Sequence, residues 1–579
     1  MTEPLFNTQD QVAMKAAFSM LKFPHKYFAN PDNLPRLKKI FKDDTPAEKL
    51  IEILNKKQLD IANHMDFSSN EIAGFKRFTN VINDNTVQYV DISSKFEKDT
   101  PLELTSIGIQ NFAHSFNMNI AEQINDQNIK LNDGEISDSK VAEILDIAWV
   151  VQHFALLTTG TLKPEERKDG TLVFKQKHKG LLTSIWFGDA LEHLSIKAAT
   201  SAIGSFAVAT YQKNDPMTEA IKKLHARVLS IIPQHWRLGL GGKTMELFHE
   251  IADLFIFLIN VVQRNQLDKE EKPLSKGEVR RMIYQYPERK GLLKTFELIK
   301  SFQKTKKSED RLFELKKGGL TLGSVKIVRG LIQQMEYFAF KKQGPDWHSE
   351  LEDDQTRFLL DDLEKFEHLD VLEFELKPDK FDASSFPKLR LDVDFFIRDK
   401  STDTVYAVQL KHVTTDDEAG LLSWIKLLGQ KDSKLNKGIL QLERLKEVVS
   451  NCNSAREYLS NKGLSEKEIM NLIPIVVHNI GSLDCMKVHN DICLYDLHTF
   501  KKALSGCRGT KEIFIDGYYE DLAPLLVNNH VDLSCPNNII DTYIKEARFS
   551  EIKYFDGAKY ITRSVTLGGV KVSAEGVGI

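Results

Sequence analysis

A chain of 579 residues is too long for one compact domain and predicts about three or four. Hydrophobic residues make up 42% and charged residues 28%, ordinary proportions for a globular protein that exclude disorder of the whole chain. The formal net charge of −4 excludes a strong overall attraction to nucleic acids or membranes. Any binding of nucleic acid would therefore depend on a local group of cations.

The cysteines and the N-terminal residues predict an intracellular protein. The five cysteines are scattered, with no C-x-x-C pair, which argues against a zinc site and a secreted disulfide framework. The first residues, MTEPLFNTQDQVAMKAAF, are acidic and interrupted, so no signal peptide is expected. The longest apolar run, residues 251–262, spans about twelve residues, whereas about twenty are needed to cross a bilayer. We therefore expect a cytoplasmic protein without membrane contact.

Residues 1 to about 340 are predicted to be mainly α-helical. Apolar residues recur every three or four positions, for example in residues 48–65 and 138–157. A polar break near Asp133 divides this region into a helical segment, 1–133, and a helical domain, 134–343. Three roles remain open for the region: sensing, binding nucleic acid, or assembly through self-association or with a partner protein.

The end of this region is basic. Residues 264–343 contain roughly 20 Lys and Arg against roughly 10 Asp and Glu. A solvated helical face would explain this excess, and so would a surface that contacts phosphates, because such contacts require cations rather than particular side chains.

Gly344-Pro345 marks a domain boundary, and the pattern changes after it. Residues 349–369, 436–450 and 497–505 have helical patterns, whereas 370–376, 389–413, 471–480 and 491–496 have strand patterns. Mixed strands and helices predict an α/β domain over 346–515, with a mixed sheet flanked by helices. Residues 516–579 are expected to form a C-terminal extension with one strand pair within 551–567, followed by a Gly-rich tail without a predicted structure.

The stretch LRLDVDFFIRDKSTDTVYAVQLKHV (389–413) carries the chemistry. Side chains alternate between the faces of a strand, so Asp392 and Asp394 share one face, opposite Leu391, Val393 and Phe395. In the second run, Gln409 and Lys411 share a face opposite Val408 and Leu410. The short polar connection predicts that the two runs are antiparallel neighbours. This pairing would bring Asp394, Gln409 and Lys411 together.

Such a group suits phosphodiester hydrolysis. Mg²⁺ is bound through one or two carboxylates together with water and substrate phosphate, so Asp394 and the side-chain carbonyl of Gln409 are suitable ligands. Lys411 would orient or deprotonate the attacking water, or stabilise charge in the transition state.

The Asp-x14-Gln-x-Lys pattern, with its flanking helices and strands, resembles the PD-(D/E)xK nuclease superfamily with its restriction-endonuclease-like fold. Gln at the usual acidic position is similar to the Mrr-like restriction endonucleases. The resemblance covers 346–515 and implies a nuclease that uses Mg²⁺ or Mn²⁺. It implies catalytic roles for Asp394, Gln409 and Lys411. The further metal ligands that it suggests are Asp392, Glu364 and Glu367, and Gln441 matches a helix glutamine of some members.

By analogy, the resemblance suggests an endonuclease acting on DNA in a prokaryotic restriction or anti-phage system. Two alternatives stay open. One is a non-catalytic nucleic-acid-binding protein with a degenerate nuclease fold. The other is a helical interaction or scaffold protein in which the hairpin is purely structural.

Overall fold

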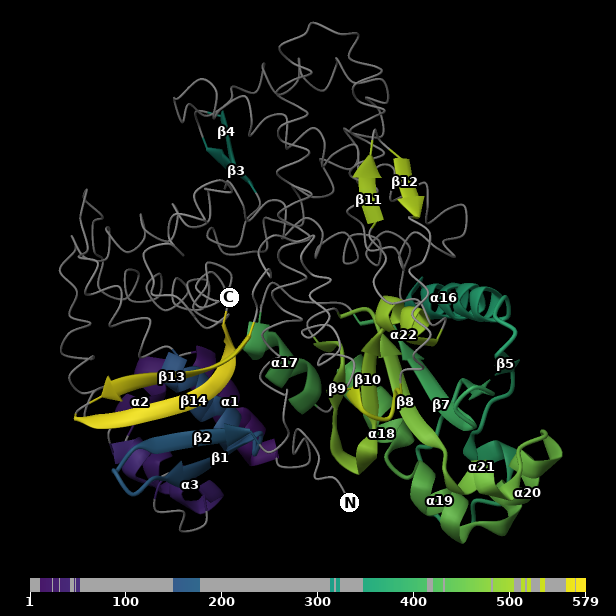
Figure 1. Cartoon of the computed structure of the whole chain (residues 1–579), viewed down its shortest axis with the longest axis horizontal. Coiled ribbons are helices and arrows are strands. Elements are labelled where there is room, and N and C mark those ends of the chain that lie inside the picture. The colour runs from purple at the N-terminus through teal and green to yellow at the C-terminus, as the bar shows by residue number, and fades with distance from the viewer. Residues whose placement is uncertain are drawn as a thin grey trace, which may run out of the picture.

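The computed structural model describes most of the residues between Trp347 and Leu504 and shorter segments elsewhere in the chain. The described residues are 11–22, 24–30, 32–41, 46, 48–52, 149–176, 313–316, 319–322, 347–413, 420–430, 433–480, 483–504, 512–515, 518–521, 532–536, 559–567 and 569–578. They form two main assemblies of helices and strands, one built around a six-stranded sheet and one around a four-stranded sheet (Figure 1).

The six-stranded sheet has the order β5-β6-β7-β8-β10-β9. Its strands are β5 (Leu369–Leu372), β6 (Phe395–Asp399), β7 (Thr404–Lys411), β8 (Ile473–His478), β9 (Met486–Lys487) and β10 (Cys493–Asp496). The first three are antiparallel, β7, β8 and β10 are parallel, and β9 is an antiparallel edge strand. The predicted mixed sheet is confirmed.

Helices cover both faces of this sheet (Figure 1). Apolar side chains of α16 (Trp347–Leu363) and α22 (Leu497–Leu504) share a core cluster with Tyr406, Val408 and Leu410. On the other face, α18 (Lys434–Leu442) and α19 (Leu445–Asn451) share a cluster with Val405 and Ala407. Since β7 is buried on both faces from 405 to 410, it is the central strand of the domain.

Three further helices contribute to the same cluster as α18 and α19. They are α17 (Gly420–Gly429), α20 (Asn453–Asn461) and α21 (Glu466–Met470). Two single turns of 3-10 helix, Pro378–Lys380 and His489–Asp491, lie in the connections between strands.

Two predicted helices differ from the observed ones. The segment 436–450 is interrupted at Glu443 and Arg444, where Arg444 has φ −99° and ψ 6°, so that it forms α18 and α19 rather than one helix. The segment 349–369 ends as a helix at Leu363, because Leu369 is already paired with Asp399 in the sheet. Tertiary pairing therefore overrides the helical pattern of the last residues.

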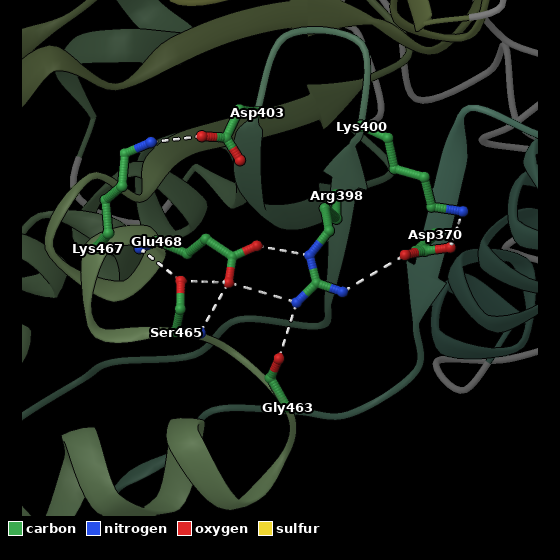
Figure 2. Close-up of polar contacts among 8 residues, drawn as sticks. All are labelled: Asp370, Arg398, Lys400, Asp403, Gly463, Ser465, Lys467 and Glu468. Atoms are coloured by element: carbon green, nitrogen blue, oxygen red, sulfur yellow. Dashed lines mark hydrogen bonds and ion pairs between the residues drawn. The ribbon is translucent and has the colours of Figure 1, made fainter.

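Arg398 joins three elements at the end of β6 (Figure 2). Its Nε donates to Glu468 Oε1 at 2.5 Å, its Nη1 lies 3.4 Å from Asp370 Oδ2, and its Nη2 donates to the carbonyl of Gly463 at 2.8 Å. Glu468 also closes the capping box of α21 with Ser465. Burial alone would raise the pKa of Glu468, but its hydrogen bonds to Arg398 and Ser465 outweigh that and hold the pKa at about 2.

The second assembly joins segments that are distant in sequence. Its strands are β1 (Leu162–Glu166), β2 (Leu172–Gln176), β13 (Lys559–Leu567) and β14 (Val570–Gly578), in the order β1-β2-β14-β13. Strand β14 is parallel to β2, so the C-terminal hairpin completes a sheet begun by residues 162–176. Helices α1 (Gln11–Lys22), α2 (Pro24–Ala29) and α3 (Asn33–Phe41) lie beside this sheet (Figure 1).

The predicted helical region 1–343 is thus described only in part. Residues 149–158 are helical in addition to α1–α3, but hairpins are also present, including β3 (Phe313–Lys316) and β4 (Gly319–Leu322). Apart from β3 and β4, the basic stretch 264–343 lies outside the described residues.

The remaining strands, β11 (Glu512–Ile515) and β12 (Tyr518–Asp521), form a separate antiparallel pair. The described part of the chain contains no helix that is long and apolar enough to span a membrane.

Helix α1 packs against α17, and a glycine permits this contact. An added Cβ at Gly429 would lie 3.0 Å from the Cε atom of Met14 and 3.1 Å from its Cβ. Met14 and Leu428 belong to the same buried cluster. The two assemblies therefore share apolar contacts through α1 and α17.

Candidate functional site

The β6–β7 hairpin brings Asp394 and Gln409 into direct contact. Phe395 pairs with Val408, and the N–H of Asp394 donates to the carbonyl of Val408 at 2.9 Å. The Nε2 of Gln409 and the backbone N–H of Leu410 both donate to Oδ2 of Asp394, each at 2.8 Å. The predicted antiparallel pairing is confirmed, and it places both polar side chains at the same end of the hairpin.

The approach to Asp394 is less regular than the sequence pattern predicts. Strand β6 begins only at Phe395, and Val393 instead forms an isolated bridge with Leu376. Leu391 and Val393 belong to one core cluster and Phe395 to the other, so these three residues do not share a face. Asp394 lies at the point where the chain turns from this bridge into the sheet.

Burial destabilises the ionised form of the Asp394 carboxylate. Burial raises its pKa to about 6, although the charge of Lys411 and the hydrogen bonds from Leu410 and Gln409 act in the opposite direction. Removing a carboxylate from water disfavours its charged form. A cation close to Asp394 would stabilise the ionised carboxylate. Such a carboxylate is suited to binding a metal ion or a positively charged group.

Lys411 is the last residue of β7, and its aliphatic stem passes close to helix α18. An added Cβ at Gly438 would lie 2.8 Å from Cγ of Lys411 and 3.5 Å from Val476 Cγ1. Glycine at this helix position is therefore required for the close approach of Lys411. Lys411 is half-buried, and its charge lies close enough to Asp394 to lower the pKa of that carboxyl.

Asp392 and Gln441 form a second pair beside the first. The Nε2 of Gln441 donates to Oδ2 of Asp392 at 2.7 Å, and the Nζ of Lys377 lies 3.6 Å from Oδ1 of Asp392. The structure therefore supplies Asp392 with a cation and an amide donor of its own. Of the two aspartates, Asp394 is the one that accepts a hydrogen bond from Gln409 and whose pKa is lowered by the charge of Lys411.

Helix α18 crosses the whole site along one stripe. Lys434, Gly438 and Gln441 are spaced by four and three residues, so they lie on one face of the helix. They contact Glu352, Lys411 and Asp392, respectively. One helix face thus fixes the positions of residues from α16, from β7 and from the segment before β6.

Glu352 of α16 is the carboxylate that sequence reasoning missed. Its Oε1 accepts from the backbone N–H of His412 and from the Nζ of Lys434, both at 3.0 Å. It shares a helical stripe with Leu359 and Leu363, both of which are buried. A charged residue on the buried stripe of the predicted helix was the available signal.

Glu364 and Glu367 are not brought to the site. Both are exposed and follow the end of α16, and Lys400 donates to the carbonyl of Glu367 at 3.3 Å. Leu369 pairs with Asp399, so these residues lie near the opposite end of β6 from Asp394, about 16 Å away at the usual rise of a strand. They are therefore unsuitable as metal ligands with Asp394, and their prediction is corrected.

Three buried oxygens of the site accept no hydrogen bond from the described residues: Gln409 Oε1, Gln441 Oε1 and Asp392 Oδ1, the last of which lies 3.6 Å from the Nζ of Lys377. No group of three His, Cys, Asp or Glu side chains within the described ranges could hold a metal ion. A cation that keeps most of its water and uses one carboxylate with a neutral oxygen, as Mg²⁺ does, remains compatible with Asp394 and Gln409.

Neighbouring histidines are buried and neutral. Burial lowers the pKa of His412 to about 3 and that of His478 to about 3. His478 pairs with Lys411 across β7 and β8. His478 therefore adds no positive charge beside Lys411.

Comparison with known proteins returned no match to this chain among protein-family models, curated proteins or solved structures.

Proposed function

We propose that the chain is a divalent-metal-dependent nuclease whose active site is formed by Asp394, Gln409 and Lys411. The observation that carries this proposal is the environment of the buried Asp394 carboxylate. It accepts a hydrogen bond from Gln409, and the charge of Lys411 is close enough to lower its pKa. A structural hairpin would gain nothing from holding a carboxylate whose pKa is raised by burial. A site for a cation and a phosphate would use both the carboxylate and the lysine.

The residues of the chain have distinct roles in this proposal. Asp394 and the side-chain oxygen of Gln409 would hold Mg²⁺ or Mn²⁺, which when bound neutralises the phosphate and acidifies water. Lys411 orients the attacking water and stabilises the negative charge that develops on the phosphate. Gly438 and Glu352 position Lys411 and the end of β7, and neither needs to touch the substrate.

The order of elements supports the resemblance to PD-(D/E)xK nucleases. A helix with carboxylates precedes the antiparallel strands β5, β6 and β7, α18 supplies Gln441, and the parallel strand β8 follows. We extend the analogy to DNA as substrate and to a role in prokaryotic restriction or anti-phage defence.

The experiment is an incubation of the full chain with supercoiled plasmid, single-stranded DNA and RNA, in Mg²⁺, Mn²⁺ or EDTA. We expect cleavage of DNA with either metal, none in EDTA, and none by Asp394→Ala with the same circular dichroism spectrum as the wild type. Binding of DNA without cleavage in any metal would instead favour a non-catalytic nucleic-acid-binding protein. Absence of both binding and cleavage would favour a scaffold.

A further inference from the structure

A groove opens beside the site, between helix α18 and the connection from β5 to β6. Its volume is about 540 Å³, within the range of about 300–1,000 Å³ that is usual for ligand sites. Its lining residues are Lys377, Pro378, Asp379, Leu389, Arg390, Leu391, Asp392, Lys437, Leu440 and Gln441. The groove is thus built by two elements that also position the candidate site.

Two of its three cations face solvent. Arg390 and Lys437 are exposed, and neither side chain forms an ion pair with another residue in the described ranges. Lys377, by contrast, lies 2.9 Å from Glu375 and 3.6 Å from Asp392. The chain as a whole carries a net charge of −4, so positive charge here is a local property. Arg390 and Lys437 are therefore available to an anionic ligand.

Besides these cations, the groove is lined by four apolar residues, by Gln441 and by two carboxylates, of which Asp392 pairs with Lys377 and Asp379 lies 3.7 Å from Lys380. Leu389 and Leu440 are half-buried and Leu391 is buried, and Pro378 adds a rigid apolar wall. A ligand with both apolar rings and anionic groups would match this lining. A nucleic-acid strand that is not base-paired exposes bases, sugars and phosphates at once, whereas a duplex presents mainly its phosphates.

The groove is continuous with the candidate site. Asp392 and Gln441, which line it, are hydrogen-bonded to each other, and Asp392 is two residues from Asp394. On α18, Lys437 precedes Gly438, the residue in close approach to Lys411. A strand lying in the groove would therefore run toward Asp394 and Lys411.

We propose that this groove binds an unpaired segment of the nucleic-acid strand that is to be cut, next to the scissile phosphate. Arg390 and Lys437 contact its phosphates, and Leu389 and Leu440 contact its sugars or bases. The inference deepens the proposed nuclease function and rests on it for the direction in which the strand runs.

The test measures binding of a fluorescent 20-nucleotide single-stranded DNA to the full chain in EDTA, over a series of salt concentrations. Each phosphate contact contributes about 0.7 to the slope of log K against log salt for single strands. The double variant Arg390→Gln/Lys437→Gln is expected to make this negative slope shallower, reducing its magnitude by about 1.4. The matched control, Lys462→Gln/Lys467→Gln, removes two exposed cations near the other end of the hairpin and should leave the slope unchanged.

A slope that is equal in the groove variant and the wild type would overturn the proposal, as would no binding of single-stranded DNA by the wild type at low salt. A blunt duplex of the same length should bind more weakly. Equal affinity for duplex, with the same loss of slope, would overturn the assignment to an unpaired strand. Cleavage assays separate the two proposals. If the wild type cleaves DNA but the groove variant has an unchanged slope, only the groove assignment is wrong. If the groove variant has a shallower slope but the wild type does not cleave, only the nuclease function is wrong.

Discussion

Gly438 is the residue whose lack of a side chain matters most to the candidate site. A methyl group there would lie 2.8 Å from Cγ of Lys411, an atom near the backbone rather than at the flexible end of the side chain. In the same helix position, alanine is intrinsically more favourable than glycine by about 1 kcal/mol. The close approach of Lys411 therefore favours glycine at this position, whereas helix stability favours alanine.

We expect Gly438→Ala to lower the cleavage rate by roughly 10- to 100-fold, because a displacement of about 1 Å at a reacting group has effects of this size. The melting temperature should change little, since the propensity gain offsets the crowding. Rates and melting curves of the same preparation check this. Wild-type activity in a folded Gly438→Ala variant would show that Lys411 is not fixed by this contact.

The raised pKa of Asp394 makes a separate prediction about stability. Between pH of about 4 and 6 the folded chain binds a proton at Asp394 more readily than the unfolded chain does, so this group's contribution to stability falls as the pH rises through that window. Asp394→Asn removes the titration. In EDTA, the variant should become more stable than the wild type at pH 8, by at most about 3 kcal/mol, and lose that advantage near pH 4.

Urea unfolding at the two pH values measures the difference. If the difference in free energy of unfolding between variant and wild type is the same at pH 4 and pH 8, the pKa of Asp394 is not raised in the folded chain. Saturating Mg²⁺ should reverse the order at pH 8, because only the wild type binds the metal through a carboxylate.

At the scale of elements, the Arg398 cluster ties β6 to β5 and to the start of α21 (Figure 2). Glu468 has a pKa of about 2 in the folded chain, below its value when unfolded, so its contribution is present above pH of about 4 and is lost as the pH falls toward 2. Charged hydrogen bonds of this kind are worth about 1.5–3 kcal/mol each.

Glu468→Gln should therefore destabilise the chain by about 1–2 kcal/mol at pH 7 and by less at pH 3.5. Denaturant midpoints at the two pH values measure this, with Glu466→Gln, an exposed residue of the same helix turn, as the control. The same loss of stability at both pH values would contradict an ionised Glu468 as the source of the effect.

Strands were more predictable from sequence than the ends of helices. The alternation of 389–413 identified the hairpin, and the apolar runs around Ile475 and Leu494 identified β8 and β10. The pattern of 349–369 was helical throughout, yet its last residues leave the helix to reach β5. Because sheet pairing ends the helix at Leu363, Glu364 and Glu367 lie in the connection to β5, away from the site.

The candidate site was predictable where it depends on one hairpin and unpredictable where it depends on packing. Gln409 and Lys411 follow from the alternation of β7, whereas Asp394 precedes β6 and follows from the pairing of the hairpin. Glu352 and Gly438 come to the site from α16 and α18, through contacts over 60 and 27 residues of sequence. Local periodicity contains no information about which helix residue will cover which strand.

At the scale of the whole molecule, the C-terminal hairpin closes a sheet with residues from the first third of the chain. Val572 is fully buried and belongs to the same cluster as Leu172 and Phe174. A charge at this position would have no partner in an apolar core.

Val572→Asp should lower the free energy of unfolding by about 3 kcal/mol or more and expose the segment 149–176 to proteases. Thr566→Asp, an exposed residue of the same hairpin, is the control and should have little effect. Melting curves and limited proteolysis followed by mass spectrometry measure both. Equal resistance of the two variants would show that the hairpin does not stabilise this assembly.

In the proposed function, Asp394 and Lys411 carry out metal-dependent cleavage of a nucleic-acid strand. The most direct measurement is the single-turnover cleavage rate of a labelled DNA strand in Mn²⁺, compared among the wild type, Asp394→Asn, Lys411→Met and the exposed control Lys467→Met. We predict that both site variants, with folding intact, lose at least about 100-fold in rate while the control does not. Cleavage by Lys411→Met at the wild-type rate, or cleavage that persists in EDTA, would contradict the assignment of this site.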